Sequence, residues 1–152
     1  MKRVLILLSL SLFFSASSFA QSWSESELQQ MYIEFLLSNS SYSEVRVDSD
    51  GDIQFSYNDR TYFIEVNEGD NEFFRVVLFN IWPIESASES RQALKACNAV
   101  NREMKVIKAY VTSDNVWIAS ELFLGEPEQF KATFTRMLKV IDDAVDTFVE
   151  KM

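Results

Sequence analysis

Apolar positions along the chain follow two spacings, one typical of helices and one typical of strands. Residues 24–27 carry the Ser-x-x-Glu pattern of a capping box, and apolar residues then recur at helical spacing, which predicts a helix over residues 25–38. Beyond residue 44 the spacing becomes two, with turn residues such as Asp50-Gly51 between the apolar runs. This alternation predicts strands over residues 44–47, 53–57, 61–67 and 72–84.

The second half of the chain repeats the change from helical to strand-like spacing. A capping box at residues 86–89 opens a predicted helix with Leu94, Cys97, Val100 and Met104 on one side. Strands are predicted over residues 105–112 and 116–124, and a last helix runs from residues 125–127 to the C-terminus. The order α-β-β-β-β-α-β-β-α and the short loops predict a single α+β domain with a mostly antiparallel sheet of about six strands and three helices.

The predicted strand at residues 72–84 is apolar on both of its faces. Trp117 and Phe123 likewise lie opposite apolar positions of the strand at 116–124. A strand of this kind must be covered on both faces. The second face is covered either within the monomer or by another chain, which is a second subunit or a partner segment. One face of the 72–84 strand carries Phe73, Val77, Phe79 and Ile81, and the other carries Phe74, Val76, Leu78 and Trp82.

The N-terminus has the three parts of a secretory signal peptide. Lys2 and Arg3 precede an apolar run at residues 4–14, and small residues lie at positions −3 and −1 of a cut after Ala20. The alternative is a membrane anchor, but the run is well short of the ~20 residues that span a bilayer. We therefore expect residues 1–20 to be removed and residues 21–152 to form the domain, located in the periplasm or secreted.

Composition excludes several classes of function. The chain has no histidine and one cysteine, which excludes zinc and copper sites of ordinary composition, Ser-His triads and Cys-His pairs. With 14 Lys+Arg against 23 Asp+Glu, the surface repels phosphates, so nucleic acid and anionic membranes are poor partners. We expect no cofactor and no enzymatic activity. Cys97, on a helix face, is predicted to be buried.

Clustered carboxylates are the remaining candidates for chemistry. Asp48, Asp50 and Asp52 alternate around Gly51, which suggests either a calcium loop or a hairpin turn with solvated carboxylates. The EF-hand pattern requires Gly where Ile53 stands, so the turn is the favoured interpretation. The remaining carboxylates are interpreted as surface charge: Glu65, Glu68, Asp70 and Glu72 around a hairpin tip, and Asp142, Asp143 and Asp146 on the polar side of the last helix.

Two stretches resemble the YbjN-type family. The first is residues 47–57 followed by Tyr62-Phe63-Ile64, and the second joins Asn98 and Asn101 to the hairpin at residues 105–117. The resemblance implies a fold similar to the type III secretion chaperones, with a twisted antiparallel sheet and helices packed against it. It also implies a non-enzymatic protein. Such a protein would either bind extended segments of a client as a chaperone-like dimer or have a regulatory role. A signal peptide argues against a cytoplasmic secretion role.

These observations support one main hypothesis and one alternative. The main hypothesis is an exported, non-catalytic, chaperone-like protein of the cell envelope that holds a protein segment, or a second copy of itself, on a sheet face. The alternative is a small-ligand or calcium sensor centred on the turn at Asp48, Asp50 and Asp52. The residues predicted to bind the partner are Phe73, Val77, Phe79, Ile81, Trp117 and Phe123.

Overall fold

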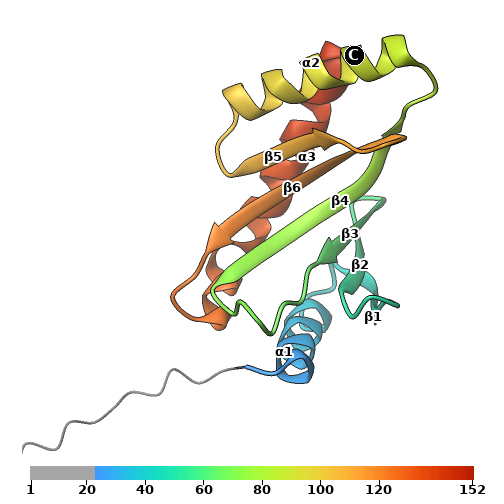
Figure 1. Ribbon diagram of the computed structural model, residues 1–152. Helices are drawn as coiled ribbons and strands as arrows, with labels where there is room; N and C mark the ends of the chain where they lie inside the picture. The colour runs from blue at the N-terminus through green and yellow to red at the C-terminus, as the bar shows by residue number, and fades with distance from the viewer. Residues whose placement is uncertain (1–22) are drawn as a thin grey trace, which may run out of the picture.

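The computed structural model describes residues 23–152, and the predicted order of helices and strands is confirmed (Figure 1). The predicted signal peptide lies outside the described residues. Among the helices in residues 23–152, none is long and apolar enough to cross a membrane. The elements are α1 (Glu25–Leu37), β1 (Ser43–Val47), β2 (Ile53–Tyr57), β3 (Arg60–Ile64), β4 (Phe73–Pro83), α2 (Ala87–Glu103), β5 (Ile107–Val111), β6 (Asn115–Phe123), the 3-10 helix η1 (Pro127–Ala132) and α3 (Phe134–Lys151).

The strands form one antiparallel sheet in the order β1-β2-β3-β4-β6-β5. Consecutive strands joined by short turns pair with each other, as hairpins require. The long strand β4 lies inside the sheet and pairs with β6 from Phe73↔Phe123 to Pro83↔Asn115. The edges of the sheet are β1 and β5.

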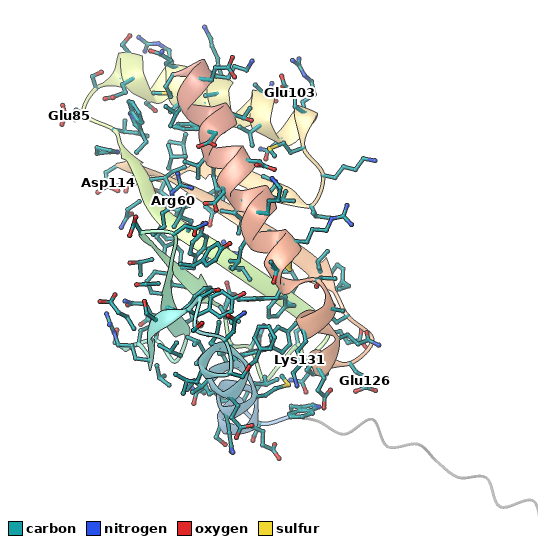
Figure 2. The ribbon with its side chains drawn as sticks, turned by 180° about the vertical axis from the view of Figure 1, so that it is seen from behind. Arg60, Glu85, Glu103, Asp114, Glu126 and Lys131 are labelled. Carbon is teal, nitrogen blue, oxygen red and sulfur yellow. The ribbon has the colours of Figure 1, made fainter. Side chains whose placement is uncertain are left out.

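The helices gather on one face of the sheet. α3 packs against β4 and β6, α2 packs against β5 and α3, and α1 packs against β1, β2 and η1. Figure 1 shows β4 and β6 in front of α3, and in Figure 2, seen from behind, α3 lies in front of the sheet. Within residues 23–152 no helix covers the other face of β3, β4, β6 and β5, and we call it the open face.

The core between the helices and the sheet is rich in aromatic rings. Phe134 lies at its centre, with its ring centroid 5.2 Å from that of Phe35 and 5.7 Å from that of Phe55. Such contacts add to the free energy of burying these large side chains. The buried rings of this cluster, from α1, η1, α3 and the sheet, are Tyr32, Tyr42, Phe55, Tyr62, Phe74, Phe130, Phe134 and Phe148.

The prediction that one helix continues from residue 125 to the C-terminus is wrong at its start. Residues Pro127–Ala132 form the 3-10 helix η1, and α3 begins only at Phe134. Thr133 separates the two, because its amide and its hydroxyl both donate to the Phe130 carbonyl. This side-chain bond competes with the helical pattern.

The prediction that Ile81 shares a face with Phe79 is also wrong. Asn80 adopts a left-handed conformation with φ 54°, and the register of β4 against β6 shifts between Leu78 and Trp82. A bulge of this kind breaks the alternation of side chains along a strand. Ile81 packs against the core cluster instead of lying on the open face.

Asp142 was predicted to be solvated surface charge, and that prediction is wrong. Its Oδ1 accepts a 2.6 Å hydrogen bond from the hydroxyl of the buried Tyr62 and forms an ion pair with Arg60. Asp142 thereby ties α3 to β3. Burial, followed by the neighbouring Asp142 carboxylate, raises the pKa of Tyr62 well above its usual range, so the phenol remains protonated and donates.

One side chain, that of Asn101, covers the middle of the outer edge of β5. The Asn101 amide accepts from the Ala109 N–H at 2.7 Å and donates to the Ala109 carbonyl at 2.8 Å. Unpaired groups at a sheet edge are a template for pairing with another chain. Asn101 satisfies both of the Ala109 groups and so blocks pairing at the middle of this strand.

Replacing Asn101 with alanine should lower the free energy of unfolding by about 1–3 kcal/mol, because the nearly buried Ala109 loses both partners. It should also promote self-association through β5. Denaturant unfolding and light scattering measure the two effects. Arg102→Ala is the control, since Arg102 is exposed on the same helix turn. Equal stability of the Asn101→Ala and Arg102→Ala variants would contradict the assignment.

Candidate functional site

Four aromatic side chains cross the open face from strand to strand. They are Phe63 on β3, Phe79 on β4, Trp117 on β6 and Tyr110 on β5, and we call them the aromatic strip. The ring centroids are 4.8 Å apart for Phe63–Phe79, 4.5 Å for Phe79–Trp117 and 5.8 Å for Tyr110–Trp117. Each of the four side chains is half-buried although no helix covers them. Trp117 is oriented by its indole N–H, which donates to Asn80 Oδ1 at 3.2 Å.

Two small residues lie among these rings and are shielded by them. Val77 pairs with Ala119 across β4 and β6, and both are fully buried yet stand apart from the main core cluster. They face the open side of the sheet, so the surrounding side chains of that face exclude water from them. The strip is therefore a small second apolar layer with one side exposed to solvent.

A charged cluster borders the strip on the next row of the sheet. The Arg75 guanidinium contacts Glu65 at 2.5 Å and donates to the Tyr110 hydroxyl at 2.6 Å. Glu121 lies 3.3 Å from Arg75 Nε, without hydrogen-bond geometry, and 3.3 Å from Lys108 Nζ. The cluster combines two cations with two carboxylates, and Arg75 is only 16% exposed. It fixes the orientation of Tyr110 at the end of the strip.

Beyond the charged cluster the open face ends in a further aromatic pair. Phe73 and Phe123 are cross-strand partners with ring centroids 5.8 Å apart. Phe123 is 80% exposed, which is unusual for a phenylalanine. Along β4 and β6 the open face thus presents the rings of Phe79 and Trp117, then the small pair Val77–Ala119, then the charged cluster, and last Phe73 and Phe123.

The strip also borders a notch where β3 separates from β4. These two strands pair only at Phe63↔Val77 and Ile64↔Val76. The Arg75 carbonyl accepts from the Glu65 amide, so alternate residues of β4, including Phe79, direct their backbone groups toward β3. Phe79 has no strand partner on that side. A hollow of about 330 Å³ lies here, lined by Arg60, Thr61, Leu78, Phe79, Asn80, Ile81 and Val145.

Comparison with known proteins places this geometry in a family. The family described as "T3SS (YopN, CesT) and YbjN peptide-binding chaperone 1", or TY-Chap1, matches residues 26–152. The chain belongs to the TY-Chap1 family. The resemblance to YbjN-type proteins is thereby confirmed. The family is one of peptide-binding chaperones, which supports non-catalytic binding of a protein partner.

Solved structures show the same fold. YbjN from E. coli is 16% identical with a TM-score of 0.54, and the alignment covers 82% of this chain and 90% of that protein. An uncharacterized protein from Methanothermobacter thermautotrophicus is 11% identical with a TM-score of 0.52, covering 82% and 98% respectively. No protein matches in a search of the curated proteins. At these identities the similarity shows the fold alone.

The structure brings together three of the residues predicted to bind a partner. Phe79, Trp117 and Val77 lie in or under the aromatic strip, and Phe73 and Phe123 lie on the same face beyond Arg75. Ile81 is turned from the open face toward the core cluster, where it lines the hollow beside Phe79. Phe63, Tyr110 and Arg75 were not predicted from the sequence to belong to the site. The alternation in β3 and β5 did place Phe63 and Tyr110 opposite core positions, but which strands are neighbours could not be read from it.

Two of the three carboxylates of the Asp48 turn, those of Asp48 and Asp52, stabilise the hairpin in this TY-Chap1 member. Asp48 Oδ1 accepts from the amides of Asp50 and Asp52, at 2.9 and 3.0 Å. Asp52 Oδ1 accepts from the Val66 amide at 2.9 Å, and Gly51 takes a left-handed φ of 92°. Within residues 23–152 no three such side chains converge as a metal site would require. The geometry favours the turn over the calcium loop.

Cys97 is buried, as predicted, on the face of α2 toward the core. Burial raises the pKa of its thiol to about 11 from an ordinary value of 9.0. The thiol is therefore held in its neutral, weakly nucleophilic form.

This shift predicts a loss of stability in alkali. Above pH 9.0 the unfolded chain releases the thiol proton, whereas the folded chain keeps it until about pH 11, so the free energy of unfolding should fall as the pH rises between these values. The decline should be smaller in Cys97→Ala, measured by denaturant unfolding at each pH. Native Cys97 should also resist thiol reagents at neutral pH and react on unfolding. Identical pH profiles for the two proteins would contradict the prediction.

Proposed function

We propose that this protein is exported to the cell envelope and holds an extended segment of a client protein on the open face of its sheet, without catalysis. The observation that carries the proposal is the aromatic strip in a member of a peptide-binding chaperone family. It is a continuous row of half-buried rings that no helix of the described residues covers. The proposal includes a regulatory role if occupancy of the strip by its client reports a state of the envelope.

The chemistry of the open face suits an extended peptide. Trp, Tyr and Arg are the residues most enriched at binding hot spots, and Trp117, Tyr110 and Arg75 lie together here. Alternate side chains of an extended segment would face the strip, at the period of a strand. Within the described residues β3 pairs with β4 only as far as Phe63↔Val77, so β4 beyond Val77 offers such a segment a strand edge at the notch.

Export rests on the sequence at the N-terminus. The basic residues, the short apolar run and the small residues before position 21 support secretion. Removing 20 of the 152 residues leaves 132, beginning at Gln21. Intact mass spectrometry of the protein recovered from fractionated cells should find this form in the periplasm or medium. A full-length chain confined to the cytoplasm would refute export and leave the binding proposal standing.

Site-specific photocrosslinking in cells tests the binding site. A benzophenone amino acid at position 79 should crosslink to another polypeptide, because Phe79 is central in the strip and borders the notch. The same group at Leu37, which is 67% exposed on α1, is the control and should give little product. Equal crosslinking at both positions, or none at 79, would refute the proposal.

The same crosslinking experiment distinguishes a client protein on the strip from a second copy of this chain. Crosslinking at position 79 to itself alone, together with a dimer mass by light scattering that survives tenfold dilution, would assign the open face to a dimer interface. A client crosslink with a monomer mass supports the proposal as stated.

A further inference from the structure

A second hollow lies on the helix-covered side of the sheet, away from the aromatic strip. It has a volume of about 430 Å³ and opens between the end of α2, the start of β5 and the first turns of α3. Figure 2 shows α2 ending at Glu103 to one side of α3, with the link to β5 running down beside that helix. The hollow is lined by Glu103, Met104, Lys105, Val106, Leu122, Thr133, Arg136, Met137 and Val140. We call it the methionine hollow.

The interior of the methionine hollow is apolar and adaptable. Met137 is 2% exposed, and Met104 and Leu122 pack against the core beside it. Methionine side chains are flexible and polarizable, so they adjust to ligands of different shape. The volume falls within the ~300–1,000 Å³ typical of small-molecule sites, which are lined mainly by apolar groups with a few polar ones.

The rim of the hollow carries two cations. Lys105 and Arg136 make no ion pair or side-chain hydrogen bond within the described residues 23–152. The single carboxylate on the rim, that of Glu103, lies 3.9 Å from Arg102 outside the hollow. In a chain of net charge −9, two unpaired cations beside an apolar cavity favour a negatively charged ligand.

The backbone at the rim is held in an uncommon conformation. Val106 has φ 56°, in the left-handed region that β-branched residues rarely adopt, and it is 50% exposed. The Val106 carbonyl accepts a hydrogen bond of 3.4 Å from the Glu121 amide, and this bond holds the turn against β6. Strained residues persist where the surrounding structure holds them, and they cluster at binding sites. The turn places Val106 in the lining of the hollow between Lys105 and β5.

We propose that the methionine hollow binds an amphipathic carboxylate, specifically a medium-chain fatty acid. The aliphatic chain lies among Met104, Leu122 and Met137, and the carboxylate is held by Lys105 and Arg136. Arg and Lys form short, charge-assisted hydrogen bonds with carboxylates. This site is independent of the proposed client site, because the two lie on opposite faces of the sheet.

Nuclear magnetic resonance titration of the purified protein with decanoate tests the proposal. Saturable shifts of backbone amide signals are expected at residues 103–106 and 133–140, below the concentration at which decanoate forms micelles. Decyltrimethylammonium, with the same chain and the opposite charge, is the control and should not compete. Absence of saturable shifts, or equal binding of the two amphiphiles, would overturn the proposal.

Two variants separate the contributions of charge and volume. The double variant Lys105→Gln/Arg136→Gln should weaken decanoate binding at least about tenfold, and Val140→Phe should abolish it by filling the hollow. Lys139→Gln is the matched control on α3 and should bind normally, because Lys139 pairs with Asp143 at 3.1 Å. Unchanged affinity in the double variant would refute the role of the rim. Crosslinking at position 79 should be the same in all four proteins.

Discussion

Replacing Phe134 with alanine should lower the free energy of unfolding by about 3–5 kcal/mol, the range for removing a buried phenylalanine ring. Phe134 is fully buried, and its ring contacts those of Phe35, Tyr42 and Phe55. It joins the first turn of α3 to both α1 and the sheet. The cavity left behind cannot close fully, because its neighbours are held by separate elements.

Urea denaturation followed by circular dichroism measures this effect. Val149→Ala is the matched control on α3, since Val149 is 50% exposed and should cost well under 1 kcal/mol. A similar loss in the two variants would show that Phe134 does not hold the core together. Phe134→Leu should recover part of the stability, because leucine refills much of the volume.

Replacing Trp117 with alanine should weaken client binding by about 2 kcal/mol or more, which is about thirtyfold. Trp117 joins two neighbours of the strip, Phe79 and Tyr110, and its removal would open a gap in the row of rings. The measurement is the affinity of the segment that crosslinks at position 79, by fluorescence anisotropy. The free energy of unfolding should fall by less than in Phe134→Ala, because one side of the Trp117 ring already faces solvent.

The matched control for Trp117 is Trp82, a tryptophan of β4 on the other side of the sheet. Trp82 lies on the core side, with its ring centroid 6.2 Å from that of Phe148 and its indole N–H donating to Glu89. Trp82→Ala should lower stability and leave the intrinsic affinity of the folded protein unchanged. If Trp117→Ala lost stability and kept its affinity, the aromatic strip would be a second core layer and not a binding site.

Local patterns predicted the elements well because they report on single segments. The capping boxes at residues 24–27 and 86–89 and the alternation through residues 53–57 each depend on near neighbours in the chain. The errors occurred where a contact from a distant element, or one local bond, overrides the pattern. Asp142 is drawn to Tyr62 from another element, and the left-handed turn at Asn80 moves Ile81 off the open face.

The candidate site was predicted only in part, for a similar reason. Phe79 and Trp117 were identified because β4 and β6 are apolar on both faces. Phe63 and Tyr110 belong to shorter strands that read as ordinary half-buried ones. Their membership of the strip depends on strand order, which places β3 and β5 on either side of the β4–β6 pair. Arg75 became meaningful only once Glu65, Glu121 and Tyr110 surrounded it.

By itself, the sequence determined the order of helices and strands, the acidic composition without histidine, the buried position of Cys97 and the resemblance to the family. These follow from periodicity and residue chemistry, which act within a segment. The tertiary structure alone decided that the helices of residues 23–152 cover one face, that they leave the aromatic strip open, and that two cations border the methionine hollow. Such features arise where segments distant in the chain meet, and side-chain packing between them selects an arrangement that no single segment encodes.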